Sequence, residues 1–182
     1  MTITQLYRST RYLIERHILG RRRLVAKASG GTEFTFQSAD AVGRYLYKHG
    51  IYETDVSDYL FSLQPARESR WFVDVGANIG YYSVQMARRG YHVLAVEPDP
   101  VNFELLNENV QRNRCKSIRT VCAALSDTCG TQPFYRYPEK NLGRHSLLPI
   151  NEGDPINVPT RRLDSLLSEQ GISMENVAVI KI

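Results

Sequence analysis

The sequence contains no apolar run long enough to span a lipid bilayer, for which about 20 consecutive apolar residues are needed. It also lacks the basic start, apolar run and small-residue cleavage site of a secretory signal peptide. Hydrophobic residues make up 42% of the 182 residues, which is ordinary for a chain that buries a core. We therefore expect a cytoplasmic globular domain with an extension.

Cysteine is also scarce. The three cysteines, Cys115, Cys122 and Cys129, are evenly spaced but lack the paired C-x-x-C pattern of a zinc site. We expect three free thiols and predict no metal site.

Acidic residues are nearly absent from the first part of the chain. Residues 1–28 carry seven Lys or Arg and one Glu, a net charge of +6, while the whole chain carries +4. Apolar residues recur there at helical spacing and predict an amphipathic helix: Ile3, Leu6, Tyr7, Leu13, Ile14 and Ile18. The favoured interpretation is that this apolar stripe packs on the domain or on a second subunit. The alternative is a helix lying on an anionic membrane surface, near a lipid-linked acceptor. No nucleic-acid-binding motif accompanies the basic residues, so we do not expect a nucleic-acid partner.

The segment Trp71 to Gly80, W-F-V-D-V-G-A-N-I-G, predicts a strand, a glycine turn and the start of a helix. Its apolar residues are typical of a strand buried on both faces. Gly76 lets the backbone turn where a side chain would block a ligand, and Gly80 lets the next helix start close to the sheet. Free N–H groups at a helix start attract an anionic group. The segment therefore predicts a site for a nucleoside-bearing cofactor.

The glycine spacing separates two classes of cofactor. A dinucleotide fingerprint beginning at Gly76 would need glycine at positions 78 and 81, where this chain has Asn78 and Tyr81. A second apolar strand, residues 92–96, ends at Glu97, where an acid can accept both hydroxyls of a ribose. The pattern D-x-G-x-N-x-G suits a smaller ligand with an amino acid end, and this ligand is S-adenosylmethionine.

Several segments together carry a specific resemblance. F-V-D-V-G-A-N-I-G-Y-Y-S, A-V-E-P-D-P-V-N-F-E-L-L-N-E-N-V, A-A-L-S-D, R-R-L-D-S-L-L and V-I-K-I resemble, in order, the FkbM family of S-adenosylmethionine-dependent O-methyltransferases. The resemblance runs from about Tyr45 to Ile182. In that family the strand ending in I-K-I continues into D-V-E-G and further strands. The resemblance therefore implies that this domain is incomplete at its C-terminus. The fourth strand would then have an open edge, through which the chain is expected to self-associate.

The expected fold is α/β, a doubly wound Rossmann-like class I methyltransferase fold with core strands in the order 3-2-1-4. We expect a basic helical arm over 1–28, a cap over 29–70 and the S-adenosylmethionine-binding domain over 71–182. The core strands are expected at 71–75, 92–96, 118–124 and 177–182. Helices are expected over 40–47, 54–63, 79–89, 100–113 and 163–169, and further extended segments over 33–37, 132–137 and 156–160.

The expected cofactor site lies outside the carboxyl end of the first core strand. Asp74 is expected near the cofactor's ammonium group, the N–H groups after Gly76 near its carboxylate, and Glu97 at its ribose. Asp99 is equally well explained as a helix cap, Asp127 as a turn former rather than an adenine contact, and Glu53, which matches a family position, as a helix-start acid. The full expected set is Glu53, Asp74, Gly76, Ala77, Asn78, Gly80, Tyr81, Glu97, Pro98, Asp99, Ser126 and Asp127.

Methyl transfer to a hydroxyl needs alignment of the acceptor, exclusion of water and removal of a proton. The candidates for the catalytic role are Lys181, at the end of the fourth strand, and His145, for which a solvated loop position is the commoner explanation. The resemblance implies a sugar, glycolipid or secondary metabolite as acceptor. A cofactor-binding but inactive fragment remains an alternative, and a nicotinamide-dependent oxidoreductase is disfavoured by Asn78 and Tyr81.

Overall fold

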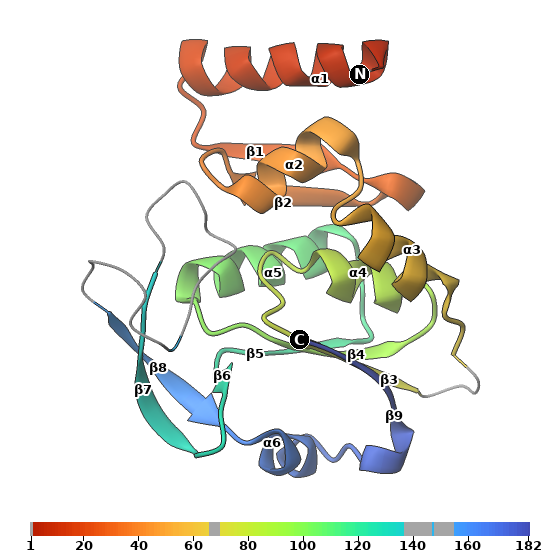
Figure 1. Ribbon diagram of the computed structural model, residues 1–182, viewed down its shortest axis with the longest axis vertical. Coiled ribbons are helices and arrows are strands. Elements are labelled where there is room, and N and C mark those ends of the chain that lie inside the picture. The colour runs from red at the N-terminus through yellow and green to blue at the C-terminus, as the bar shows by residue number, and fades with distance from the viewer. Residues whose placement is uncertain (1, 66–69, 137–146, 148–154) are drawn as a thin grey trace.

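The computed structural model describes all residues except 1, 66–69, 137–146 and 148–154. Figure 1 shows three tiers: a terminal helix, a small sheet with one helix, and a larger α/β layer beneath them. The N-terminal elements are α1 (Ile3–Leu13), a π-helical turn η1 (Ile14–Ile18), β1 (Arg23–Lys27), a short turn η2 (Ser29–Gly31), β2 (Glu33–Gln37), α2 (Ala41–His49) and α3 (Thr54–Ser62). None of the helices in the described part of the chain has the length and apolar character that a membrane crossing requires.

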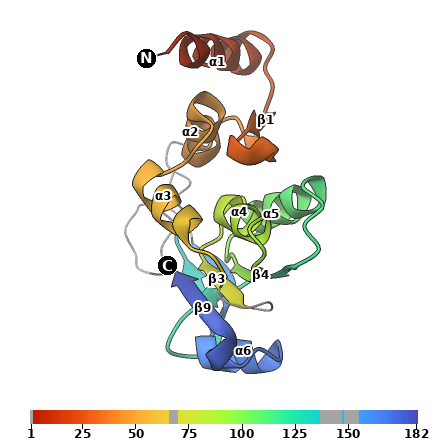
Figure 2. The ribbon, with the colours of Figure 1, turned by 90° about the vertical axis from the view of Figure 1, so that its right-hand side faces the viewer.

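A four-stranded parallel sheet forms the centre of the larger layer. Its strands are β3 (Trp71–Val75), β4 (His92–Val96), β5 (Ile118–Val121) and β9 (Val177–Lys181), in the order β5-β4-β3-β9. This confirms the expected order 3-2-1-4. The helices α4 (Tyr81–Ala87) and α5 (Pro100–Arg112) cover one face of the sheet, and α6 (Leu163–Glu169) covers the other, as Figures 1 and 2 show. The fold is therefore the doubly wound α/β fold that the sequence predicts.

The central strands are buried on both faces, which explains their nearly continuous apolar sequences. Phe72 belongs to a core cluster with residues of α4 and α5, whereas its neighbour Val73 packs with Leu166 and Leu167 of α6. Successive side chains of a strand point to opposite faces, so each strand supplies both cores.

The third expected strand is shorter than predicted. β5 ends at Val121, and residues Ala124–Leu125 form β6 in a separate sheet with β7 (Gly130–Phe134) and β8 (Ile156–Arg161). The chain changes sheets because Ala124 pairs with Thr160 of β8 instead of continuing beside β4. A short 3-10 turn, η3 (Met174–Asn176), precedes β9.

The strand β1 differs from the expected arm over 1–28. Leu24 and Ala26 are buried while Arg23, Val25 and Lys27 are exposed, and the strand pairs antiparallel with β2 along its whole length. Gly20 has a φ of +60°, a conformation that glycine adopts readily, and it separates the helical segment from the strand.

The apolar stripe of the terminal helix does not pack on the domain. Ile3 is 89% exposed and Ile18 75% exposed, whereas the side of α1 that faces the domain presents Tyr12. Of the two surfaces expected to cover this stripe, the domain is therefore wrong, whereas a second subunit stays a prediction. Periodicity identifies residues that share a helix face, but it does not determine which way that face points.

Candidate cofactor site

A cavity of about 410 Å³ lies at the carboxyl end of β3. In a doubly wound sheet this is where ligands bind, because the connections on either side of the strand run in opposite directions. Its walls come from the turn after β3, the first turn of α4, the α2–α3 region and the end of β9: Val42, Tyr52, Glu53, Val75, Gly76, Ala77, Asn78, Ile79, Tyr81, Tyr82, Lys181 and Ile182. The expected residues Glu53, Gly76, Ala77, Asn78 and Tyr81 thus lie together.

Asp74 is fully buried at the end of β3, directly before the cavity-lining residues. Ser83 Oγ donates a 2.6 Å hydrogen bond to its Oδ2. Its Oδ1 has no hydrogen-bond partner among the described residues but lies 3.2 Å from Lys181 Nζ, close enough for an ion pair. The buried carboxylate therefore keeps hydrogen-bonding capacity at Oδ1.

The Lys181 ammonium lies among three oxygens at the end of β3. It donates 3.2 Å hydrogen bonds to the carbonyl oxygens of Val75 and Gly76, besides its ion pair with Asp74. All three contacts direct the Lys181 nitrogen toward oxygen atoms of the protein itself, at the end of β3 and the turn after it. The geometry favours a role in positioning the turn over a role as catalytic base.

The turn after β3 places Gly76 in the left-handed region, at a φ of +67°, with open space where a Cβ would lie. Its N–H and that of Ala77 donate to Val96 O at 2.9 and 3.0 Å, and the N–H of Gly80 donates to Ala77 O at 2.8 Å. These three N–H groups therefore bond within the protein, and the expectation that N–H groups after Gly76 face a ligand carboxylate stays a prediction. At Gly76 the turn therefore presents backbone atoms without a side chain, including carbonyl oxygens, to the cavity.

Gly80 has a different role from the one expected. A Cβ on this residue would lie 2.5 Å from Leu106 Cδ1, and its φ is +85°. The missing side chain allows close contact between the start of α4 and α5, rather than between α4 and the sheet.

Glu97 lies at the carboxyl end of β4, as expected, but it is only 3% exposed and does not line the cavity. Its Oε2 accepts a 2.7 Å hydrogen bond from the Asn78 N–H, and its Oε1 accepts a 2.9 Å bond from the Asp99 N–H. Burial, the largest influence, raises the pKa of Glu97 to about 7. The carboxylate ties the glycine turn to the end of β4.

This pKa predicts a pH-dependent stability. Because the folded protein holds the Glu97 proton more tightly than the unfolded chain, the resulting stability is fully present below pH 4.5 and is lost as the pH rises through 7. Between pH 4.5 and 8 we expect the parent to lose about 3 kcal/mol relative to Glu97→Gln, which does not titrate. Urea unfolding of both proteins across this range measures the difference, and a constant difference would contradict the assignment.

The cap region contributes an acid and an aromatic wall to the cavity. Glu53, at the start of α3 with a φ of +44°, accepts a 2.9 Å hydrogen bond from Tyr82 OH. Burial raises the pKa of Tyr52 to about 12, with Glu53 adding to the shift, and burial likewise raises the pKa of Tyr82. Both hydroxyls therefore stay protonated near neutral pH, and neither acts as a base.

Several expected residues lie away from the cavity walls. Asp99 caps α5 by accepting a hydrogen bond from the Val101 N–H at 2.7 Å, and its Oδ2 accepts from Arg136 Nε at 2.6 Å. Its role as a helix cap therefore accounts for an acid at this position. Pro98 lies beside it, partly buried. Ser126 and Asp127 lie in the loop between β6 and β7, where Ser126 Oγ donates to Asp127 Oδ1 at 3.1 Å. His145 lies outside the described residues.

Two tyrosines of the cavity wall are absent from the expected site. Tyr82 follows Tyr81 directly, so its place on the first turn of α4 was the available signal. Tyr52 lies before α3, and it reaches the cavity because its ring packs edge-on against Tyr81, with centroids 6.2 Å apart. Among the described residues, no group of three His, Cys, Asp or Glu side chains is placed to hold a metal ion, and the three cysteines are unpaired thiols.

Residues 74–182 match the protein family described as Methyltransferase FkbM domain. Methyltransferase sdnD of Sordaria araneosa is 33% identical over 103 residues, which cover 54% of this chain and 39% of sdnD. Hexuronic acid methyltransferase AglP of Haloferax volcanii is 29% identical over 163 residues, which cover 89% of this chain and 64% of AglP. The chain thus spans less than two thirds of either relative. Among solved structures, M. jannaschii TYW2 in complex with AdoMet has 16% identity and a TM-score of 0.44, over 65% of this chain and 54% of that one.

Proposed function

The chain belongs to the FkbM family of methyltransferases, and we propose that it forms the cofactor-binding part of an S-adenosylmethionine-dependent O-methyltransferase. The family's methyl donor agrees with the cofactor predicted from the segment between Asp74 and Gly80. The observation that carries the proposal is the cluster formed by Asp74 Oδ1 and the carbonyl oxygens of Val75 and Gly76, which already holds one ammonium group within 3.2 Å.

The residues at the cavity fit the parts of this cofactor. Asp74 Oδ1 has capacity for the ammonium of the amino acid end, and Gly76 leaves the backbone open beside it. Glu97, which lies outside the cavity wall, is the candidate for the ribose, since each carboxylate oxygen accepts a backbone hydrogen bond and has a second lone pair. The expected adenine contact from Asp127 remains a prediction.

When bound, the cofactor supplies a sulfonium methyl group that is already activated for transfer. The protein's contribution is to align an acceptor oxygen and to exclude water. Tyr52, Tyr81 and Tyr82 supply an aromatic wall on the cap side of the cavity. Glu53 is the carboxylate that lines the described part of the cavity, and it is our candidate for receiving the acceptor proton.

We propose a hydroxyl of a sugar, glycolipid or secondary metabolite as the acceptor. The name of AglP supports the sugar class, since that relative is described as a hexuronic acid methyltransferase and aligns with 89% of this chain. The name does not specify the methylated group: a hexuronic acid carries hydroxyl groups, whose methylation makes an ether, and a carboxylate, whose methylation makes an ester.

Calorimetric titration with S-adenosylhomocysteine and with NAD tests the cofactor assignment. We expect binding of S-adenosylhomocysteine in preference to NAD, and loss of at least about tenfold in affinity in Gly76→Val, because the added side chain fills the space beside the backbone. Gly171→Val is a matched control: both glycines have a φ between +65° and +67° and open space at the Cβ position, but Gly171 lies outside the cavity.

Both variants introduce the same backbone strain, so both should be destabilised to a similar extent. Equal affinity in Gly76→Val and the parent, or preference of the parent for NAD, would refute the cofactor site. Methyl transfer to uronic acids and other hydroxylated acceptors, followed with a radiolabelled methyl group, tests turnover separately. Cofactor binding without turnover would favour a binding-only role for this chain.

A further inference from the structure

The terminal helix α1 and the turn η1 turn their apolar side chains away from the protein. The outer face of this segment consists of six side chains that are 42–89% exposed: Ile3, Leu6, Tyr7, Leu13, Ile14 and Ile18. The opposite side presents Tyr12 and Glu15, which are only 2% and 7% exposed. In Figures 1 and 2, α1 forms the extreme tier of the molecule, beyond β1 and α2. A contiguous exposed apolar surface on a helix marks a site of interaction.

Polar contacts hold the helix in this orientation. Tyr12 OH donates a 2.5 Å hydrogen bond to Ser38 O, which also accepts from Arg16 at 3.0 Å. The buried carboxylate of Glu15 accepts a 3.0 Å bond from Tyr47 OH and lies 3.2 Å from Arg11 Nε. Turning the apolar face inward would break these contacts and leave buried polar groups unsatisfied. These buried polar contacts therefore stabilise the orientation of α1 in which its apolar residues point outward.

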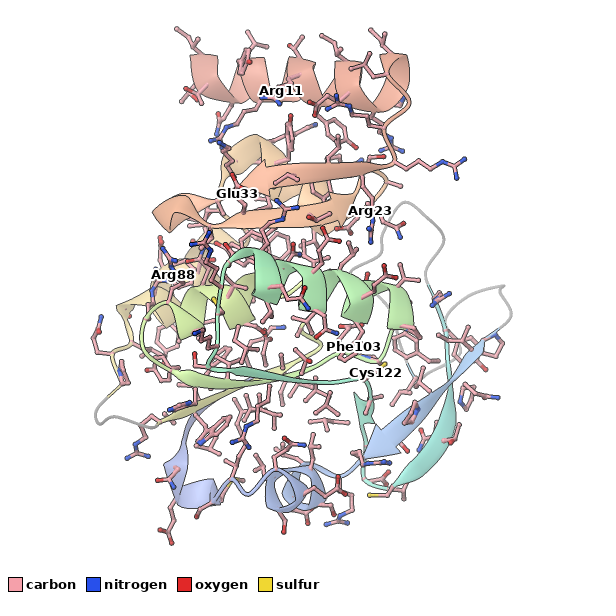
Figure 3. All side chains as sticks on the ribbon, turned by 180° about the vertical axis from the view of Figure 1, so that it is seen from behind. Arg11, Arg23, Glu33, Arg88, Phe103 and Cys122 are labelled. Carbon is pink, nitrogen blue, oxygen red and sulfur yellow. The ribbon has the colours of Figure 1, made fainter. Side chains whose placement is uncertain are left out.

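A basic pocket of about 430 Å³ adjoins the outer face. Four cationic side chains line it, against the single carboxylate of Glu33, and its lining is Thr4, Tyr7, Arg8, Arg11, Val25, Lys27, Glu33, Tyr47 and Arg112. Figure 3 shows Arg11 beneath α1 and Glu33 on the β1–β2 tier below it. Glu33 lies 3.7 Å from both Lys27 and Arg112, so it offsets part of their charge. Tyr7 belongs to both the pocket and the outer face, so the two surfaces are continuous.

We propose that α1 docks on an anionic lipid surface, with the outer face among the acyl chains and a phosphate-bearing headgroup at the basic pocket. Helices that lie in the membrane interface combine an apolar face with basic residues beside it, and attraction to anionic lipids adds to apolar burial. The proposal goes beyond the proposed function, because it concerns where the protein binds rather than which reaction it carries out.

Charge favours a membrane over a second copy of the chain as the occupant. Residues 1–28 carry a net charge of +6, so pairing two outer faces would bring two strongly positive segments together. An anionic bilayer instead compensates this charge, and its acyl chains cover the apolar side chains.

Flotation of the 182-residue protein with vesicles tests the proposal. We expect binding to vesicles of phosphatidylcholine with about one quarter phosphatidylglycerol, little binding to phosphatidylcholine alone, and weaker binding at high salt. The double variant Leu6→Glu/Ile14→Glu should bind at least about tenfold more weakly. The control Met174→Glu changes a residue with similar exposure, 58%, on η3 and should bind like the parent.

A second pair of variants tests the basic pocket. Arg8→Ala should weaken binding to the anionic vesicles about fivefold, whereas Lys116→Ala, on an exposed lysine outside the pocket, should change it little. Circular dichroism confirms that the variants keep the parent's fold. Failure of the parent to float, equal binding by the double variant, or sedimentation showing a dimer that the double variant abolishes would overturn the proposal. Cofactor titration in the same variants is independent of these outcomes.

Discussion

Replacement of Asn109 by alanine is expected to lower the free energy of unfolding by about 4 kcal/mol, because it leaves three buried backbone groups without partners. Asn109 lies on α5 and is fully buried. Its Nδ2 donates to Thr35 O at 3.0 Å and to Ile79 O at 2.8 Å, while its Oδ1 accepts from the Thr35 N–H at 2.7 Å. One side chain thus joins α5, the middle of β2 and the turn after β3.

Asn107→Ala is the matched control on the same helix. Asn107 is partly buried, and its amide donates to Phe103 O at 2.9 Å and accepts from Thr120 Oγ1 at 2.8 Å. Because solvent reaches this site, we expect a loss of about 1 kcal/mol. Urea unfolding followed by circular dichroism measures both changes. Equal losses in the two variants would show that the hydrogen bonds of Asn109 to β2 and to the turn after β3 do not stabilise the protein as expected.

The central sheet could be predicted because its residues carry strong local signals. The strands β3 and β4 are apolar on both faces, and Pro100 and the capping residue Asp99 mark the start of α5. The right-handed connection rule then determines the strand order. These signals depend only on residues that are neighbours along the chain, so they can be recognised without knowledge of the tertiary structure.

The direction of α1 and the presence of β1 depend on contacts that local patterns do not contain. The outer face of α1 follows helical periodicity, but the hydrogen bonds of Tyr12 and Glu15 with distant residues decide that it points outward. Similarly, β1 has only two buried side chains, and its pairing with β2 creates the strand.

Some features of the cofactor site could likewise be predicted from the sequence, and others could not. The positions of Asp74 and Glu97 follow from strand ends and could be predicted. The internal hydrogen bonds of the turn could not, because they require the end of β4 to lie beside the glycine turn, where Val96 O and Glu97 Oε2 accept its N–H groups. For the same reason the sequence suggested Lys181 as a catalytic candidate, whereas the fold places its ammonium against Asp74.

Replacement of Lys181 by methionine is expected to destabilise the protein by about 3 kcal/mol at neutral pH, since it removes the cation beside a buried carboxylate. The side chain of Asp74 is 1% exposed and that of Lys181 21% exposed, with 3.2 Å between Oδ1 and Nζ. Methionine preserves most of the side-chain volume, so the effect measures the lost charge and hydrogen bonds rather than a cavity. Lys27→Met is the control, because its pair with Glu33 is 3.7 Å long and exposed, and we expect a change below about 1 kcal/mol.

The double variant Lys181→Met/Asp74→Asn distinguishes this explanation from lost packing. Removing the Asp74 charge as well should recover part of the stability, giving a coupling energy of about 1–3 kcal/mol between the two sites in urea unfolding. Additive effects would show that the ion pair contributes nothing and that Lys181 acts only through its bonds to the carbonyls of Val75 and Gly76. Because those carbonyls and Asp74 form the proposed ammonium site, Lys181→Met should also alter cofactor affinity, whereas Lys27→Met should leave it unchanged.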